Sequence, residues 1–376
     1  MELNEEFSTV ERVLLDNAQK SHTPVNGVIE LLPLCNMNCD MCYVRLSREE
    51  MEKQGRLRTA DEWLEIGRQM QKAGTLFLLL TGGEPLIYSD FKKLYLGLKN
   101  LGMIIAINTN GTLLDEEWAD FFAENKPRRI NITLYGSDER AYKELCHYPG
   151  GFEKVTRAIK LLRDRGVDVR IGGSLTKANR ADLGKILESG VFYDAPVRVD
   201  TYMMPAVRER GKPFAEQSRL DPESAAAARV EALRSEMGED LFAQYVNQSI
   251  ELAENPPNYP SEPRGMTCRA GNCSFTINWQ GEMRPCVVMT EPAASVFEVG
   301  FEKAWQYIVE ECGKIRLNIK CSQCKLRHLC RTCAASALLE EGSYDGVPEY
   351  MCRYAAETLR LLKAVSYTHL TLPTKA

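Results

Sequence analysis

Short apolar runs alternate with longer amphipathic segments from residue 27 to about residue 205. The apolar runs have the length and composition of buried strands, and the segments between them carry apolar residues at helical spacing. In one such segment, Thr59 is a suitable helix N-cap and Gly74 a suitable terminator. This alternation predicts parallel strands joined by right-handed crossovers. The expected strands cover residues 27–33, 76–80, 103–108, 130–135, 167–175 and 197–204.

Six strand–helix units are compatible with either a doubly wound sheet or a partial barrel, and in both folds the functional residues lie at the carboxyl ends of the strands. After this α/β region comes a helical segment, in which Asp221 is expected to cap a helix that has Pro222 in its first turn. A cysteine-rich segment follows, with too few apolar residues for a core of its own. The predicted divisions are an N-terminal helical extension (1–24), the α/β region (25–205), the helical segment and linker (206–265), the cysteine-rich domain (266–364) and a tail (365–376).

The tail resembles translated sequencing-adapter sequence, and we exclude it from fold reasoning.

A net charge of −5 argues against nucleic-acid binding, which needs a basic face. The apolar run at 76–80 is too short to span a membrane, and the first residues lack the pattern of a signal peptide. A soluble, cytoplasmic protein is therefore expected. In a reducing compartment, thirteen cysteines indicate metal or redox chemistry rather than disulfides.

Three of the cysteines, Cys35, Cys39 and Cys42, form a C-x3-C-x2-C run that directly follows the first expected strand and is closed by Tyr43. A structural zinc ion takes four protein ligands, and a four-iron cluster has four corners that each take one thiolate. Three local thiolates thus leave one iron open, unless a distant residue closes it. Zinc held by the three thiolates and a distant ligand is the alternative that the spacing leaves open.

The second expected strand ends in T-G-G-E-P, residues 81–85. Paired glycines allow a ligand to approach the main chain closely, and Glu84 is a suitable acceptor for an ammonium group. Alone, such a string is most often a turn. One strand–helix unit after the three cysteines, it forms a specific pattern.

Together these motifs resemble the radical S-adenosylmethionine (SAM) superfamily, over residues 25 to 205. The resemblance implies an α/β fold with a partial (β/α)6 TIM-like barrel. It also implies that the cysteine trio holds a [4Fe–4S] cluster whose fourth iron binds the amino and carboxylate groups of SAM. Reductive cleavage of SAM would then yield a 5′-deoxyadenosyl radical, which abstracts hydrogen from a substrate. The implied SAM contacts are Gly82, Gly83 and Glu84 to the methionyl ammonium, Tyr43 near the adenine, and Asn110 and Thr133 as further candidates.

For Asn110 and Thr133 the alternative is an ordinary polar residue at a strand end. Tyr135 stands where many relatives have an aspartate. The arginine that some relatives place soon after this strand is not identified, so the contact to the SAM carboxylate is left open.

The later cysteines resemble the SPASM extension of radical SAM peptide and protein maturases, through Cys268-x12-Gly281-x4-Cys286, a C-x2-C-x5-C-x2-C run and a final cysteine. The last spacing of the run departs from the family's x3. The resemblance implies a small C-terminal iron–sulfur domain with two auxiliary [4Fe–4S] clusters. Their implied ligands are Cys268, Cys273, Cys286 and Cys333 for one cluster, and Cys321, Cys324, Cys330 and Cys352 for the other.

His328 is an alternative ligand within the run, and residues 321–333 alone read as a four-cysteine zinc module. Cys146 and Cys312 need no function, because free cysteines are commonly small buried hydrophobes.

SPASM proteins act mainly on peptide or protein side chains, so the resemblance implies anaerobic oxidative modification or crosslinking of a ribosomal peptide. It also implies an electron donor such as flavodoxin or ferredoxin. A leader peptide would be recognised by a separate protein, by residues 206–265, or not at all. Sulfatase maturases of this type carry an aspartate after the equivalent of Cys286; Val287 stands there and disfavours that activity. A radical SAM enzyme of a small metabolite and a non-enzymatic zinc protein are further alternatives. The sequence identifies no proton acceptor.

Overall fold

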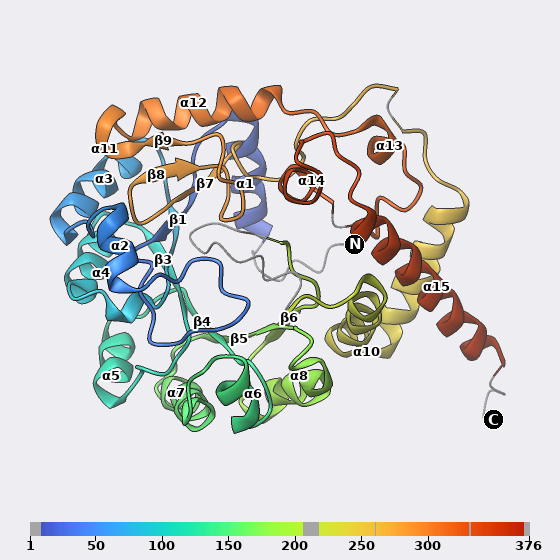
Figure 1. Ribbon diagram of the computed structural model, residues 1–376, viewed down its shortest axis with the longest axis horizontal. Coiled ribbons are helices and arrows are strands. Elements are labelled where there is room, and N and C mark those ends of the chain that lie inside the picture. Colours follow the sequence, from blue (N-terminus) through green and yellow to red (C-terminus); the bar gives the residue numbers. More distant parts are fainter. Residues whose placement is uncertain (1–8, 206–217, 260, 331, 372–376) are drawn as a thin grey trace.

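The computed structural model describes residues 9–205, 218–259, 261–330 and 332–371. Six parallel strands lie side by side in chain order, from β1 to β6 (Figure 1). A doubly wound sheet contains a point where the strand order reverses, whereas these six strands show no reversal, which confirms the partial barrel. The strands are β1 (Asn26–Glu30), β2 (Phe77–Thr81), β3 (Ile104–Thr109), β4 (Arg129–Thr133), β5 (Val169–Ser174) and β6 (Val197–Asp200).

Helices line the outer side of the curved sheet (Figure 1). The predicted cap at Thr59 is confirmed: its hydroxyl accepts the backbone N–H of Glu62, and the Glu62 carboxylate accepts the backbone N–H of Thr59. That helix ends before Gly74, whose φ is +96°. The helices of this part are α1 (Thr9–Ser21), α2 (Arg48–Gln54), α3 (Ala60–Lys72), α4 (Phe91–Asn100), α5 (Glu116–Glu124), α6 (Glu139–Glu144), α7 (Gly151–Asp164) and α8 (Leu183–Phe192), with short 3-10 turns at Pro85–Ile87 and Arg180–Asp182.

The sheet continues past β1 into the cysteine-rich region. Strand β7 (Ser274–Ile277) pairs parallel with β1, and β8 (Glu282–Arg284) and β9 (Ala294–Ser295) add two antiparallel strands. Gly281 lies in the β7–β8 turn with a φ of +94°, and a Cβ there would be 2.2 Å from the Phe297 ring. A side chain at this position would therefore be doubly unfavourable. Helices α11 (Val296–Val299) and α12 (Phe301–Lys314) follow.

Two long helices, α10 (Pro222–Glu254) and α15 (Glu349–Thr371), pack against each other beside the barrel (Figure 1). The expected cap of α10 is confirmed, because an Asp221 carboxylate oxygen accepts the Ser224 N–H at 2.8 Å. Between them in sequence lie α13 (Ile319–Ser322) and α14 (Ala334–Glu341). Residues 206–217 of the predicted helical segment and 372–376 of the predicted tail fall outside the described residues. Among the described helices, none combines the length and apolar character that a membrane span requires.

Candidate functional site

The cysteine trio lies in the loop that leaves the carboxyl end of β1. Two backbone hydrogen bonds fasten this loop to the chain just beyond α6: Asn38 N–H donates to Cys146 O at 3.0 Å and Asp40 N–H to Leu145 O at 3.0 Å. Within the loop, the Cys42 N–H donates to Cys39 O. The loop therefore has a defined position at the barrel mouth, as expected for residues that follow a parallel strand.

The diglycine turn lies directly against this loop. The Gly83 N–H donates to Leu32 O at 2.7 Å and the Glu84 N–H to Leu34 O at 2.9 Å. A Cβ on Gly83 would stand only 2.3 Å from Leu34 O. Glycine is thus required at position 83 because two backbones meet there, immediately before Cys35. The sequence suggested close approach of a ligand; the described contact is between two segments of the chain.

Glu84 is fully buried and joins the ends of β2 and β3. Its Oε1 accepts from Leu86 N–H at 3.1 Å and from the Thr109 hydroxyl at 2.8 Å, and its Oε2 accepts from Asn110 N–H at 2.7 Å. Burial raises the pKa of Glu84 to about 7, although all three donors oppose the shift. The carboxylate is therefore a structural link, and Oε2 retains a lone pair for the predicted ammonium contact.

Asn110 connects the end of β3 to the trio. Its side-chain amide donates to Asn36 Oδ1 at 2.9 Å and lies 3.6 Å from Cys35 Sγ, while its Oδ1 accepts from the Thr112 hydroxyl at 2.6 Å. The amide of Asn110 therefore contacts a sulfur of the trio, which an ordinary polar residue at a strand end would not do. Its contact with SAM stays a prediction.

Tyr135 and Cys146 are two neighbours of the trio that the sequence did not identify as such. Cys39 is buried, and its hydrogen bond with Cys146 is the largest cause that raises its pKa, followed by burial. A hydrogen bond from Tyr135 acts in the opposite direction. Tyr135, which follows β4, thus directs its hydroxyl to a trio sulfur. The sequence marked Tyr135 only as the replacement of an aspartate, and nothing in it separated Cys146 from an ordinary core residue.

The trio has the donor set that a four-iron cluster needs. Burial raises the pKa of Cys35 to about 12, and the charges of Glu84, Cys39 and Cys42 add to this, so the three sulfurs lie within electrostatic reach of one another. Among the described residues, no group of three or more His, Cys, Asp or Glu side chains is spaced to hold a single metal ion. A zinc ion, with Zn–S bonds of about 2.3 Å, would require such a group. Three converging thiols are one fewer than a structural zinc ion takes, and they are the donor set of a four-iron cluster with one open iron.

The two remaining SAM candidates lie at the same mouth. Tyr43 follows the trio and packs against the main core. Thr133 ends β4, with its register partner Gly172 on β5. Their contacts with SAM stay predictions.

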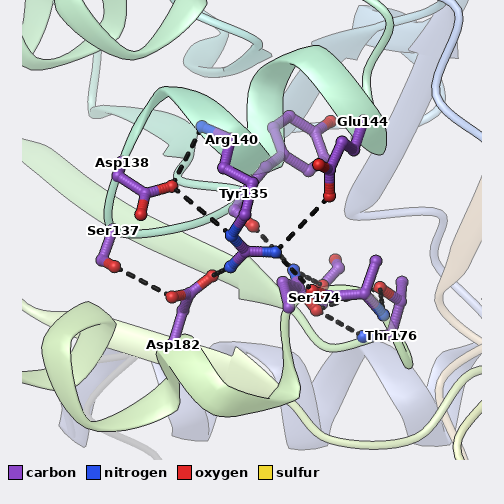
Figure 2. A network of polar contacts seen from close by, with 10 residues as sticks. Tyr135, Ser137, Asp138, Arg140, Glu144, Ser174, Thr176 and Asp182 are labelled. Atoms are coloured by element: carbon purple, nitrogen blue, oxygen red, sulfur yellow. Dashed lines mark hydrogen bonds and ion pairs between the residues drawn. The ribbon is translucent and has the colours of Figure 1, made fainter.

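Arg140 is an arginine that follows β4, and acidic groups hold its guanidinium (Figure 2). Asp182 lies 3.0 Å from it, Glu144 3.7 Å and Asp138 4.0 Å. Asp182 also accepts the Ser137 hydroxyl at 2.9 Å. This network ties the loop after β4 to the start of α8. The three carboxylates compensate the positive charge of Arg140, and the contact to the SAM carboxylate stays open.

The second implied set of auxiliary ligands comes together around α13 and the start of α15. After burial, the charges of Cys330, Cys352 and Cys324 raise the pKa of Cys321, which shows that the four thiols are neighbours. His328 instead has its Nε2 2.9 Å from the carbonyl oxygen of Ser249 on α10. That contact gives no support to the histidine alternative.

The first implied set is brought together in part. Beyond burial, the charges of Cys333 and Cys268 raise the pKa of Cys286, so these three thiols are neighbours. Cys273 lies within electrostatic reach of Cys268, but it is fully buried and its Sγ lies 3.9 Å from the carbonyl oxygen of Leu15 on α1. Cys312, to which the sequence gave no function, lies within reach of Cys268 and Cys286.

Residues 29–188 match the family model of the radical SAM superfamily. The chain contains a radical SAM domain. This family implies a [4Fe–4S] cluster and SAM, the groups for which the trio and the diglycine turn are suited. The match includes Cys35, Cys39, Cys42 and Gly82 to Glu84.

The alignments with related proteins extend well beyond residues 29–188. The AdoMet-dependent heme synthase of Methanosarcina barkeri is 25% identical over 330 residues, which are 84% of this chain and 92% of that protein. The PqqA peptide cyclase of Rhodopseudomonas palustris is 24% identical over 267 residues, 70% of this chain and 67% of the relative. The crystal structure of Streptococcus suis SuiB bound to S-adenosylmethionine has a TM-score of 0.66 at 19% identity, and covers 92% of this chain and 83% of SuiB. The fold likeness thus includes the cysteine-rich region.

Proposed function

We propose that this radical SAM protein is an enzyme that oxidises or crosslinks a side chain of a peptide or protein. One observation carries the catalytic part. The diglycine turn is hydrogen-bonded to the backbone immediately before Cys35, at 2.7 and 2.9 Å, and the Asn110 amide lies 3.6 Å from the Cys35 sulfur. The trio and the diglycine turn, which are 40 residues apart between Cys42 and Gly82, therefore meet at the barrel mouth.

The residues of this site would hold the cluster and bind SAM. Cys35, Cys39 and Cys42 hold the cluster, and Tyr135 and Asn110 donate hydrogen bonds to its sulfurs. When bound, the cluster and SAM supply one-electron cleavage of the 5′-carbon–sulfur bond and a 5′-deoxyadenosyl radical, which takes a hydrogen atom from the substrate. The free lone pair of Glu84 Oε2 accepts from the methionyl ammonium.

The auxiliary cysteines and the relatives favour a peptide substrate. The PqqA cyclase acts on a peptide, and SuiB has been solved with its precursor peptide SuiA. After the first hydrogen atom is lost, an oxidised side chain must give up one more electron and one proton. A cluster with all four irons ligated by cysteine does not bind SAM and can transfer electrons. The two auxiliary clusters, each held by four cysteines, would therefore accept that electron. A flavodoxin or ferredoxin would reduce the trio's cluster. Recognition of a leader peptide would fall to a separate protein or to residues 206–265, or would not be needed.

The first experiment tests the trio. Protein purified without oxygen and reconstituted with iron and sulfide is reduced in the presence of SAM, and 5′-deoxyadenosine is measured. We expect the Cys35→Ala variant to release no 5′-deoxyadenosine and to contain about four irons fewer per chain than the unsubstituted protein.

Cys146→Ala is the matched control, because this thiol neighbours Cys39 but lies outside the motif. We expect it to retain all its iron. Loss of four irons in Cys146→Ala would mean that a fourth thiolate closes the cluster, and would refute an open iron for SAM.

The second experiment tests the substrate. Short peptides encoded beside the gene are coexpressed with the protein and analysed by mass spectrometry. We expect one peptide to lose two hydrogens, and Cys35→Ala to prevent this loss. Release of 5′-deoxyadenosine with no change in any such peptide would refute the peptide substrate and leave the radical chemistry intact.

A small-molecule substrate is the second candidate, since the heme synthase from Methanosarcina barkeri aligns with 84% of this chain. Formation of heme by the reconstituted protein from added heme precursors, with no peptide modified, would favour it. Val287 continues to disfavour formylglycine formation, because valine accepts no proton.

A further inference from the structure

Cys312 lies against the loop that carries the first auxiliary cysteine. It is on α12, near the carboxyl end of the helix, and its side chain is buried. Gly271 in the facing loop has a φ of +64°, and a Cβ there would be 2.3 Å from Cys312 Sγ. The sulfur of Cys312 therefore rests directly on the backbone between Cys268 and Cys273.

The same sulfur lies within electrostatic reach of two proposed ligands. Burial raises the pKa of Cys312 to about 12, and the charges of Cys268 and Cys286 contribute next. Tyr344 is a shared neighbour: after burial, the charges of Cys312 and Cys286 both raise its pKa. Cys312 also belongs to the main core cluster, against which Cys286 and Cys333 pack.

Cys273 also lies within electrostatic reach of Cys268, but its sulfur is directed toward α1, 3.9 Å from the carbonyl oxygen of Leu15. It immediately precedes β7, and its backbone carbonyl accepts the Asn26 N–H at 3.2 Å. Its side chain belongs to a separate apolar cluster with Leu15, Ala18, Val25 and Phe77. This is the environment of a packing residue that holds α1 against the sheet.

We propose that Cys312, together with Cys268, Cys286 and Cys333, ligates the first auxiliary cluster, and that Cys273 is a structural residue. This inference rests on the proposed function, because it assumes that the auxiliary cluster is present. The family spacing would select Cys273, which is nearer in sequence. Cys312 lies on a helix outside the cysteine pattern, and only the fold brings it to Cys268.

The test compares Cys312→Ala with Cys273→Ala in the full-length, anaerobically reconstituted protein. We expect Cys312→Ala to contain about four irons and four sulfides fewer per chain, with a matching decrease in absorbance near 400 nm. Cys273→Ala should keep its full iron content and show a lower unfolding temperature instead. The opposite pattern, or full iron content in both variants, would overturn the inference.

A second measurement avoids variants that fail to fold. The unmodified protein is treated with a thiol-alkylating reagent before and after its iron is removed by a chelator, and each cysteine is quantified by mass spectrometry. We expect Cys312 to become reactive when iron is removed, along with Cys268 and Cys286, while Cys273 remains protected by packing. Cys273 becoming reactive while Cys312 stays protected would refute the assignment.

Failure of this inference can be told apart from failure of the proposed function. A protein that binds no iron, or that releases no 5′-deoxyadenosine with its clusters intact, contradicts the enzymatic proposal itself. A protein that releases 5′-deoxyadenosine but loses iron only in Cys273→Ala contradicts the ligand assignment alone.

Discussion

Gly83→Ala should damage the site more than any other single-methyl addition to the diglycine turn. The new Cβ would be 2.3 Å from Leu34 O and 2.7 Å from Leu34 C, against an ordinary contact of 3.4 Å or more. These are backbone atoms, so no side chain can rotate away, and the two loops must separate by about 1 Å. The separation also weakens the 2.7 and 2.9 Å hydrogen bonds from Gly83 and Glu84. Overpacking at about 1–3 kcal/mol and two hydrogen bonds at about 1 kcal/mol each predict a loss of roughly 3–5 kcal/mol.

Urea unfolding of the metal-free protein measures this loss, and iron content after reconstitution measures its effect on the trio. We expect Gly83→Ala to lower both. Gly184→Ala is the matched control: Gly184 lies in α8, and a Cβ there meets no atom within 4 Å. It should raise stability by about 0.5–1 kcal/mol, as alanine does for glycine in a helix. Gly83→Ala with unchanged stability and full iron would show that the loops do not meet as described.

Three further variants probe the groups around the trio. Asn110→Ala, which removes the amide beside the Cys35 sulfur, should make the trio's cluster easier to lose during gel filtration, as followed by its absorbance; equal retention would contradict a supporting role. Tyr135→Phe removes a donor to Cys39 and should lower the reduction potential of the cluster in a redox titration, since hydrogen bonds to cluster sulfurs raise it. The Glu84 carboxyl, with its pKa raised to about 7 by burial, holds its proton longer in the folded than in the unfolded chain. Stability should therefore fall by about 3 kcal/mol as pH rises from 4.5 to 7, and Glu84→Gln should abolish this slope in urea titrations of the metal-free protein.

The elements of the barrel could be predicted from the sequence because their signals are local. Apolar runs of strand length and the caps at Thr59 and Asp221 depend on residues a few positions apart. The place of the trio followed from one further rule, that loops after parallel strands meet at one edge of the sheet. The continuation of the sheet through β7 could not be predicted, because a four-residue strand inside a turn-rich segment carries little periodicity.

The side-chain environment of the site could be predicted less well, because its contacts join distant segments. Tyr135 reaches Cys39 across two strand–helix units, and Cys146 reaches the same sulfur from beyond α6. Cys312 lies on a helix whose pattern is that of an ordinary amphipathic surface helix. A free cysteine in such a helix is indistinguishable from a small apolar residue until its neighbours are known.

The directions of β1 and β8 decide on which side of the sheet's strand ends the trio and Cys286 lie. The trio follows the carboxyl end of β1, whereas Cys286 follows β8, which runs antiparallel to β7 and ends at Arg284, level with Val28 in the middle of β1. Because β8 runs opposite to β1, the chain leaves β1 toward the barrel mouth and leaves β8 in the opposite direction. We therefore expect a side chain held at the trio's mouth for hydrogen abstraction to make no direct contact with a cluster bound by Cys286. The first auxiliary group must act on such a substrate through electrons or through the stability of the fold, and a saturated four-cysteine ligand set, completed by Cys312, is the coordination that suits both roles.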